Sequence, residues 1–374
     1  STGGKPARPC STRSRLASGG AHGVVLARGV CMGLMASVLT ITSRAVAGFG
    51  RTGGNYAIMS VLETRSLCRS VTQGFQLRRE IHRTDAQPST VRTHTTDFLS
   101  CTEPQPSVAL VFLNSPGVRA QCGAGRALSL FERLWRVAGT RICADGAANR
   151  LFDGLGEETR RQRHIPDLIR GDLDSLRPDV RAYYEARGVR VERVDEQMTH
   201  DLYKCLDALH TQHVDAAIRR RADGDDSAGL VAGASELTVV VLGAFGGRLD
   251  QEMSNMNMLF QWTGFGQMFL MSEDSLAVLL PPGEHRIVHN PELESRVCGL
   301  IPLGAPCAQV RTSGLKWDLE DAELAFGGMV SSSNEVVGDE VFVRTSGPLV
   351  WTTSLRRTPW AGATGSEYTT PAAM

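Results

Sequence analysis

The stretch Arg141-Ile-Cys-Ala-Asp-Gly-Ala-Ala-Asn-Arg150 decides the fold of this chain. It begins with a short apolar run, 141–144, and changes at Asp145 to an acidic, glycine-containing turn. A short apolar run that stops at turn residues is typical of a buried strand. The stretch therefore predicts a strand that ends in a carboxylate.

The same pattern of strands and amphipathic segments continues on both sides of this stretch. An apolar run at Val108–Leu113 comes before it, and Ala127–Val137 between them has apolar residues at helical spacing. Strand, helix and strand in this order indicate a parallel sheet. Further on we predict a strand at Leu168–Ile169, a helix opened by Pro178, a helix over Asp201–His210 and a strand at Thr238–Leu242. Residues 107–271 are therefore expected to form an α/β domain with a mostly parallel sheet.

The chain changes character after about Ser272. Turn signals such as Pro281-Pro282-Gly283 separate short strand-like runs, which is typical of a β-sandwich. We expect this second domain over residues 272–355, followed by a tail at 356–374. The charged, glycine-containing segment Arg219–Ser235 is interpreted as a surface insertion whose basic start is a solvated helix end.

Residues 1–106 are predicted to lie outside both domains. The first acidic residue is Glu63, and residues 1–58 are rich in Arg, Ser, Gly and Ala, so they have the composition of a transit peptide for a mitochondrion or plastid. The alternative is an extension without a targeting role, with translation starting at Met32, Met35 or Met59 and a cytoplasmic protein. Residues 59–106 are interpreted as a linker.

Bulk composition favours a small-molecule partner. The 374 residues include 40 basic and 40 acidic ones, so net charge gives no reason to expect binding to nucleic acid or to a membrane. The apolar stretch Cys31–Thr42 is too short to span a bilayer. Nine scattered cysteines without a C-x-x-C pair favour a reducing compartment.

Acidic residues follow two of the predicted strands directly. Asp145 ends the first, and Asp172 and Asp174 follow Leu168–Ile169 in the sequence Gly-Asp-Leu-Asp-Ser. Parallel sheets bind ligands at this edge, and carboxylates that converge there repel one another unless a cation such as Mg²⁺ is bound. Mg²⁺ suggests a polyphosphate substrate. The alternative is that these residues only form turns or cap helices.

A glycine-rich segment follows the strand Thr238–Leu242. In Gly243-Ala-Phe-Gly-Gly-Arg-Leu-Asp-Gln251, backbone N–H groups and Arg248 are suited to bind phosphate oxygens, and Asp250 adds an acid. The alternative is a tight turn in which Arg248 and Asp250 pair with each other. The sequence has no G-x-x-x-x-G-K-[ST], which argues against an ordinary P-loop kinase.

These motifs, in this order, resemble the thiamin pyrophosphokinase family. The resemblance begins with Ala-Asp-Gly-x-Ala-Asn-Arg, Gly-Asp-x-Asp-Ser, Thr-x-Asp-x-x-Lys-Cys and Gly-Gly-Arg-x-Asp-Gln, and it covers about Val108–Thr353. In the second domain it rests on Cys298–Gly304, Thr312–Trp317, Phe326–Asn334 and Pro348–Trp351.

The resemblance implies transfer of a pyrophosphoryl group from ATP to thiamin, giving thiamin diphosphate and AMP. By motif, the catalytic and Mg²⁺-binding acids would be Asp145, Asp172, Asp174 and Asp201. The ATP phosphates would be bound near Arg248, Asp250, Gln251, Lys204 and Asn149, although Lys204 could equally lie on a solvated helix face.

In the family, thiamin lies in a cleft between two subunits, so the resemblance implies a homodimer. Trp317 would stack on the pyrimidine ring, with Ser333 and Asn334 near the same pocket. Without the family context, Trp317 is more readily interpreted as a core residue of the sandwich.

Two departures from the family pattern matter. Ala147 replaces a glycine, which is tolerated if its φ is negative. His200 stands between Thr199 and Asp201, and this extra residue weakens the assignment of Asp201; we expect His200 to be an exposed helix-start residue. Two alternatives to the implied activity are therefore another Mg²⁺-dependent kinase or nucleotidyltransferase, and a thiamin- or nucleotide-binding protein that has lost catalysis.

Overall fold

The structure is a computed structural model of the chain. It describes residues 91–116, 129–196, 199–222 and 236–356. The predicted transit peptide, most of the predicted insertion and nearly all of the predicted tail lie outside these residues. Within the described ranges, no helix is both long enough and apolar enough to span a bilayer.

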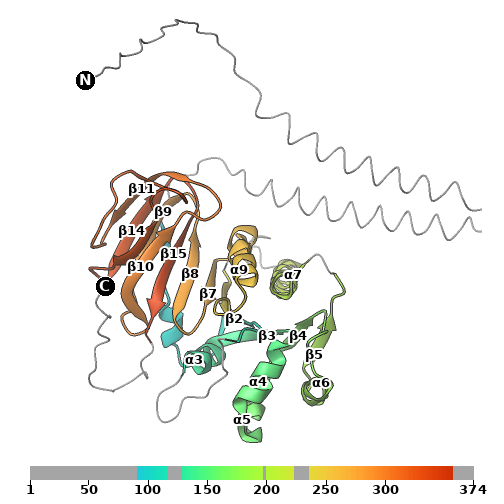
Figure 1. Cartoon of the computed structure of the whole chain (residues 1–374). Coiled ribbons are helices and arrows are strands. Elements are labelled where there is room, and N and C mark those ends of the chain that lie inside the picture. Colours follow the sequence, from blue (N-terminus) through green and yellow to red (C-terminus); the bar gives the residue numbers. More distant parts are fainter. Residues whose placement is uncertain (1–90, 117–128, 197–198, 223–235, 357–374) are drawn as a thin grey trace, which may run out of the picture. The chain divides into compact units, whose positions relative to one another are not determined.

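A ten-stranded mixed sheet forms the centre of residues 87–374 (Figure 1). Its order is β13-β10-β15-β8-β7-β6-β2-β3-β4-β5, and every pair from β7 to β5 is parallel. The parallel strands are β2 (Gln105–Phe112), β3 (Ala138–Ala144), β4 (Leu168–Gly171), β5 (Arg190–Arg193), β6 (Thr238–Leu242) and β7 (Gln267–Met271). The antiparallel ones are β8 (Ser275–Leu280), β15 (Leu349–Leu355), β10 (Glu294–Ile301) and β13 (Ser331–Glu335).

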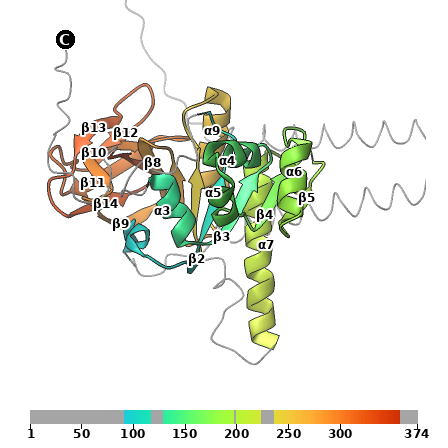
Figure 2. The ribbon, with the colours of Figure 1, turned by 90° about the horizontal axis from the view of Figure 1, so that it is seen from below.

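Helices cover both faces of the parallel half (Figures 1 and 2). Alternate strand residues point to opposite faces, so each face has its own apolar core. One face packs against α3 (Leu130–Val137), α4 (Ala147–Leu155) and α6 (Pro178–Glu185), with the short α5 (Glu158–Arg163) following α4. The other face packs against α7 (Asp201–Ala222) and α9 (Leu249–Gln261).

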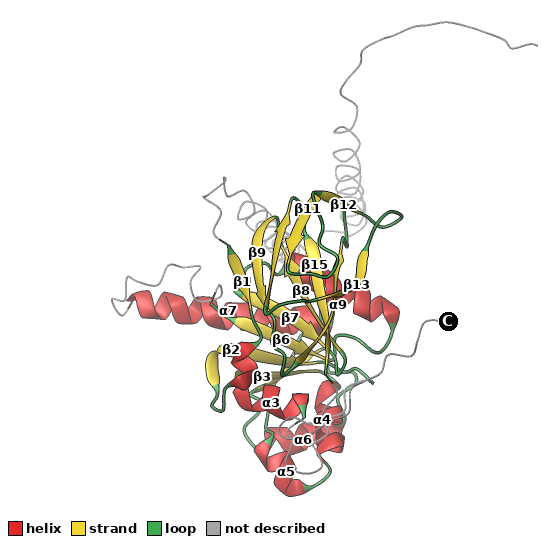
Figure 3. Cartoon of the chain, turned by 90° about the vertical axis from the view of Figure 1, so that its left-hand side faces the viewer, coloured by secondary structure: helices red, strands yellow, loops and turns green. Residues whose placement is uncertain are grey.

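A second sheet packs on the antiparallel half and completes a sandwich (Figure 3). Its order is β1-β9-β14-β11-β12. The strands are β1 (Arg92–His94), β9 (Gly283–Val288), β14 (Glu340–Thr345), β11 (Cys307–Ser313) and β12 (Ala322–Leu324). Val341 and Val343 of this sheet belong to the same buried cluster as Val278 and Trp351 of the long sheet.

The predicted fold class, an α/β domain followed by a β-rich domain, is confirmed. The two parts are more continuous than expected, because β7 passes to β8 through a turn at 272–274 within one sheet. The helix predicted over Asp201–His210 extends to Ala222, so Arg219–Arg221 belong to its last turn, as expected for a helix end.

The prediction that residues 59–106 are a linker is wrong for their final part. Residues 92–100, which we call the N-terminal strap, form β1 and the 3-10 helix η1 (Asp97–Ser100). β1 pairs in parallel with β9, His94 Nε2 lies 3.0 Å from His285 Nδ1, and Leu99 is buried. The strap is therefore part of the sandwich, held by backbone pairing and side-chain burial.

The cysteines that the structure describes form no disulfide. Cys143, Cys205, Cys298 and Cys307 are buried, as expected for cysteines that serve as small apolar residues, and Cys101 is half-buried.

Candidate active site

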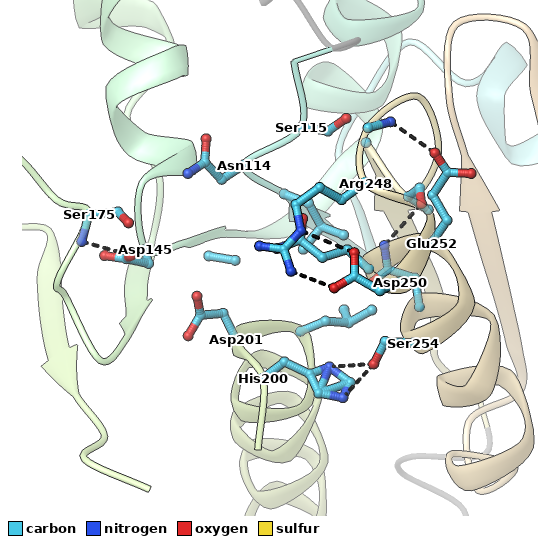
Figure 4. Close-up of a pocket in the computed structure, with 18 of the residues that line it drawn as sticks. Asn114, Ser115, Asp145, Ser175, His200, Asp201, Arg248, Asp250, Glu252 and Ser254 are labelled. Atoms are coloured by element: carbon cyan, nitrogen blue, oxygen red, sulfur yellow. Dashed lines mark hydrogen bonds and ion pairs between the residues drawn. The ribbon is translucent and has the colours of Figure 1, made fainter. Parts of the chain in front are cut away.

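A cavity of about 590 Å³ opens at the carboxyl ends of the parallel strands (Figure 4). The chain runs from β2 outward through β3 and β4 to β5 and then returns to β6 on the other side of β2. The strand order therefore reverses next to β2, and open α/β sheets bind ligands at such a point. The lining comes from the segments 113–116, 144–145, 172–175, 199–202 and 243–255.

Three of the four predicted acids meet in this cavity. Asp145 follows β3, Asp172 follows β4, and Asp201 is the first residue of α7. One carboxylate oxygen from each lies within 4.8 Å of the others. The extra residue His200 therefore does not displace Asp201 from the group that the motifs predicted.

Backbone geometry brings these carboxylates together. Asp145 has a φ of 44°, a left-handed conformation that Asp tolerates better than most residues. Gly171 lies beneath the group: a Cβ there would lie 2.7 Å from Asp145 Cβ and 3.0 Å from Asp201 Oδ1. Glycine at 171 therefore allows Asp145 and Asp201 to converge. Ala147 does not have a positive φ, so the departure from the family's second glycine is accommodated.

The clustered carboxylates repel one another, and the buried ammonium of Lys204 partly offsets this repulsion. Burial raises the pKa of Asp145, and the neighbouring Asp201 carboxylate raises it further. Burial also raises the pKa of Asp201, although Lys204 opposes this shift. The Lys204 side chain is only 2% exposed, and its Nζ lies 3.2 Å from Asp201 Oδ1 and 3.7 Å from Asp172 Oδ2. The interpretation of Lys204 as a residue on a solvated helix face is wrong.

The donor set suits a hard divalent cation. Asp145 Oδ2 accepts a hydrogen bond from the Ser175 N–H at 3.1 Å, whereas the buried Oδ1 has no hydrogen-bond partner among the described residues. Three converging carboxylates with one buried oxygen unsatisfied are what a bound Mg²⁺ would complete with water and phosphate oxygens.

The fourth acid, Asp174, lies beside this group. It lines the cavity, but its Oδ1 accepts a hydrogen bond from Ser175 Oγ at 2.9 Å, and it is not one of the three clustered carboxylates. Asn149 supports the same loop from α4: its amide donates to the Ser175 carbonyl at 2.7 Å and accepts from the Arg177 N–H at 3.1 Å. Asn149 therefore shapes the loop and is not part of the cavity lining that the structure describes.

The glycine-rich segment forms the opposite wall. Arg248 precedes α9 and makes a two-point ion pair with Asp250, with 3.0 Å between Arg248 Nε and Asp250 Oδ1. This pairing of Arg248 with Asp250 is the alternative to phosphate binding that the sequence analysis left open. Both side chains are nevertheless exposed at the cavity, together with Gln251, so solvent screens the pair and Arg248 remains accessible.

His200 lies exposed at the start of α7, as expected, but it also has a partner. Its imidazole Nε2 lies 2.7 Å from Ser254 Oγ of α9, and partial desolvation of the ring lowers its pKa. This contact joins the two helices that border the cavity (Figure 4).

Several lining residues were not predicted. Asn114 and Ser115 follow β2, Asn114 Oδ1 accepts from Arg150 Nε, and Ser115 Oγ donates to the Phe245 carbonyl at 3.3 Å. Their signal in the sequence was available, because two polar residues follow the apolar run Val108–Leu113 directly. Glu252, Ser254 and Asn255 had no such signal, because the helix that carries them was not expected.

The residues predicted to bind thiamin lie in the sandwich. Trp317 is 57% exposed, so its interpretation as a core residue is wrong. Asn334 is buried, and its amide accepts from the Trp317 N–H at 3.2 Å and donates to the Trp317 carbonyl at 2.9 Å. Ser333 is exposed with a φ of 56°. None of the three is among the described residues that line the cavity.

Asp145→Asn is expected to raise the melting temperature of the protein at neutral pH in the presence of EDTA. The folded state raises the pKa of Asp145, so its ionisation above that pKa costs stability, and this cost is absent below the ordinary Asp pKa of about 3.9. Asparagine removes the charge and tolerates the positive φ. Added Mg²⁺ should then stabilise the wild type more than the variant, as thermal scans can measure. A lower melting temperature of the variant in EDTA would show that the carboxylate is a structural acceptor.

Both parts of the chain match known protein families. Models of the thiamin pyrophosphokinase catalytic domain and of the thiamin pyrophosphokinase vitamin B1 binding domain match residues 131–270 and 284–350. The chain is 39% identical over 233 residues to thiamine pyrophosphokinase 2 of Oryza sativa subsp. japonica, covering 60% of this chain and 81% of that protein. Thiamine pyrophosphokinase 1 of Arabidopsis thaliana is 38% identical over 234 residues, with the same coverage of 60% and 81%. The crystal structure of yeast thiamin pyrophosphokinase matches with a TM-score of 0.59 at 26% identity, over 73% of this chain and 94% of that one.

Proposed function

The chain belongs to the thiamin pyrophosphokinase family, and from this premise we propose that it transfers the β,γ-pyrophosphoryl group of ATP to the hydroxyl of thiamin with the help of Mg²⁺. The products are thiamin diphosphate and AMP. The observation that carries the proposal is the convergence of Asp145, Asp172 and Asp201 at the switch point of the sheet.

The residues of the cavity are suited to position a polyphosphate and to balance its charge, which is most of what phosphoryl-type transfer requires. Arg248 exchanges its exposed partner Asp250 for phosphate oxygens. Lys204, which is not among the described lining residues, balances the charge of Asp172 and Asp201. A carboxylate that reaches the thiamin hydroxyl accepts its proton as the oxygen attacks the β-phosphorus.

Asp145, Asp172 and Asp201 would hold the Mg²⁺. When bound, Mg²⁺ neutralises charge on the phosphate oxygens and on the leaving AMP. This assignment is supported by the unsatisfied Asp145 Oδ1 and by the raised pKa of Asp145 and Asp201.

We also propose that the active form is a homodimer. The described lining of the cavity comes from residues 113–255 alone, so it includes no residue of the sandwich. A second copy of the chain could therefore bring its Trp317 to the cavity. The edge strand β13, its neighbour β10 and the nearby loops expose apolar side chains, which favours an interface there: Val297, Trp317, Phe326, Met329 and Val337. Sedimentation equilibrium should give twice the mass of the chain. A protein that sediments as a monomer and is fully active at the same concentration would contradict the proposal.

The activity is tested by incubating the full chain with ATP, Mg²⁺ and thiamin and separating the nucleotides by chromatography. AMP and thiamin diphosphate should form in equal amounts, and omission of thiamin should abolish AMP formation. ADP as the product would instead indicate another kinase on the same fold. The other alternative, a binding protein without catalysis, has no support in the site, because His200 leaves the three acids together.

Trp317→Ala is expected to raise the KM for thiamin roughly tenfold with little change in the KM for ATP. Stacking of a base on an aromatic side chain is worth about 1–3 kcal/mol. The Trp317 ring is exposed, with Lys316 Nζ 4.9 Å from its centroid, so it can provide such stacking. Initial rates with each substrate varied in turn measure both constants. Trp317→Phe, which keeps an aromatic face, is the matched control and should lose much less. Equal increases in both KM values would indicate a structural role.

A further inference from the structure

The tip of the glycine-rich loop is bound by a carboxylate of the protein itself. The backbone N–H groups of Gly246 and Gly247 both donate to Glu252 Oε1, at 3.0 and 2.9 Å (Figure 4). Hydrogen bonds from amides to an ionised acceptor are stronger than those between neutral groups. These N–H groups are the donors that the sequence suggested for phosphate, and Glu252 already occupies them.

The rest of the loop is fixed by other contacts. The N–H groups of Gly243 and Ala244 donate to the Met271 carbonyl, Asn255 Nδ2 donates to the Ala244 carbonyl, and Ser115 Oγ donates to the Phe245 carbonyl. Among the residues that the structure describes, Glu252 alone holds the N–H groups of the tip. Glu252 and Asn255 are three residues apart on α9, so one face of this helix holds both ends of the loop.

The tip determines where Arg248 lies. Gly246 has a φ of 93°, a left-handed conformation that glycine adopts readily, and its N–H donates to Glu252 Oε1 in this turn. Arg248 follows the tip directly and is the N-cap residue of α9. Its own ion pair with Asp250 is exposed and screened by water, so that pair does little to fix the backbone. Without the Glu252 carboxylate, the residues directly before Arg248 would lose the contact that holds their N–H groups.

We propose that Glu252 is a positioning residue that holds the glycine-rich tip, and with it Arg248, in the conformation that receives the phosphates of ATP. The proposal rests on the proposed function for the identity of the ligand. The opposite role is a gate, in which Glu252 competes with phosphate for the two amides and must leave before ATP binds.

Three variants of the full chain separate these roles. Glu252→Ala removes the acceptor, Glu252→Asp keeps the charge but shortens the reach, and Glu252→Gln keeps the reach and a carbonyl acceptor without the charge. The exposed Gln261→Ala at the end of the same helix is the control. We expect the KM for ATP to rise about tenfold in Glu252→Ala and Glu252→Asp, and much less in Glu252→Gln. The KM for thiamin should stay within about twofold in all four.

Hydrogen exchange of the peptide covering residues 243–249 gives a readout that needs no turnover. Amide protection should fall in Glu252→Ala and Glu252→Asp and persist in Glu252→Gln and Gln261→Ala. A lower KM for ATP in Glu252→Ala would overturn the proposal in favour of the gate, and unchanged protection would overturn it altogether. If the wild type fails to convert thiamin, the proposed function fails, whereas lost protection in Glu252→Ala would still support the role of Glu252 in holding the loop.

Discussion

Asp172→Asn is expected to lower kcat by about 100- to 1,000-fold or more while the protein stays folded. Asp172 is one of the three clustered carboxylates, and its Oδ2 lies 3.7 Å from the buried Lys204 Nζ. Its side chain is 42% exposed, so an amide of the same shape should cost little stability. The loss is therefore expected in catalysis, through a weakened cation site. Steady-state kinetics at saturating Mg²⁺, with circular dichroism to check folding, measure it.

Asp174→Asn is the matched comparison, since it makes the same chemical change two residues away. Asp174 lies outside the three clustered acids and bonds to Ser175 Oγ, so its replacement should reduce kcat by a clearly smaller factor. From the motif alone both substitutions are expected to abolish activity; the structure separates them. Near-normal turnover of Asp172→Asn would contradict the assignment of the cation site, and equal losses would place Asp174 in it as well.

Leu99→Ala is expected to lower the free energy of unfolding by about 2–5 kcal/mol, the usual cost of a cavity in a packed core. Leu99 of the N-terminal strap is 2% exposed and belongs to the main apolar cluster. Its neighbour Phe98 contacts Phe269 of β7, with ring centroids 5.9 Å apart. This loss would be a large fraction of the roughly 5–15 kcal/mol by which a typical domain is stable.

Val91→Ala is the control for this prediction, because Val91 is 47% exposed just before β1. Its replacement should change the free energy of unfolding by no more than about 0.5 kcal/mol. Urea titrations of both variants, monitored by tryptophan fluorescence, give the two values. If the strap were a linker, as its sequence suggested, Leu99→Ala would be as harmless as Val91→Ala.

The sequence predicted the strands most accurately where their side chains are fully buried. β6 has the predicted bounds Thr238–Leu242, since a central parallel strand buried on both faces is a continuous apolar run. β3 and β4 were recognisable for the same reason, and the acids at their ends followed from the position of the strand ends. The convergence of Asp145 and Asp172 could therefore be predicted from the residues alone.

The peripheral elements could not be predicted, because their side chains do not alternate in polarity. β1 is Arg-Thr-His and β5 is Arg-Val-Glu-Arg, and both are edge strands held mainly by backbone pairing. The helix α9 was missed because its N-terminus has no side-chain cap and follows a glycine-rich loop. Because α9 was not predicted, the contacts of Glu252 and Ser254 could not be predicted from the sequence.

Two residues of the candidate site have environments that depend on tertiary packing. Lys204 lies on a helix whose pattern gave no reason to expect a nearly buried ammonium, and its burial follows from the carboxylates around it. Trp317 has the composition of a core residue, yet Asn334 binds its backbone and leaves the ring exposed. In both cases long-range contacts decide the position.

The central claim, pyrophosphoryl transfer to thiamin, is tested most directly by following ATP labelled with ³²P at the β-phosphorus. Attack on the β-phosphorus moves the label into thiamin diphosphate and leaves unlabelled AMP, and this is the result we expect. Attack on the γ-phosphorus would leave the label in ADP, and attack on the α-phosphorus would leave it in free pyrophosphate. Label in ADP or in pyrophosphate, with none in a thiamin ester, would contradict the account.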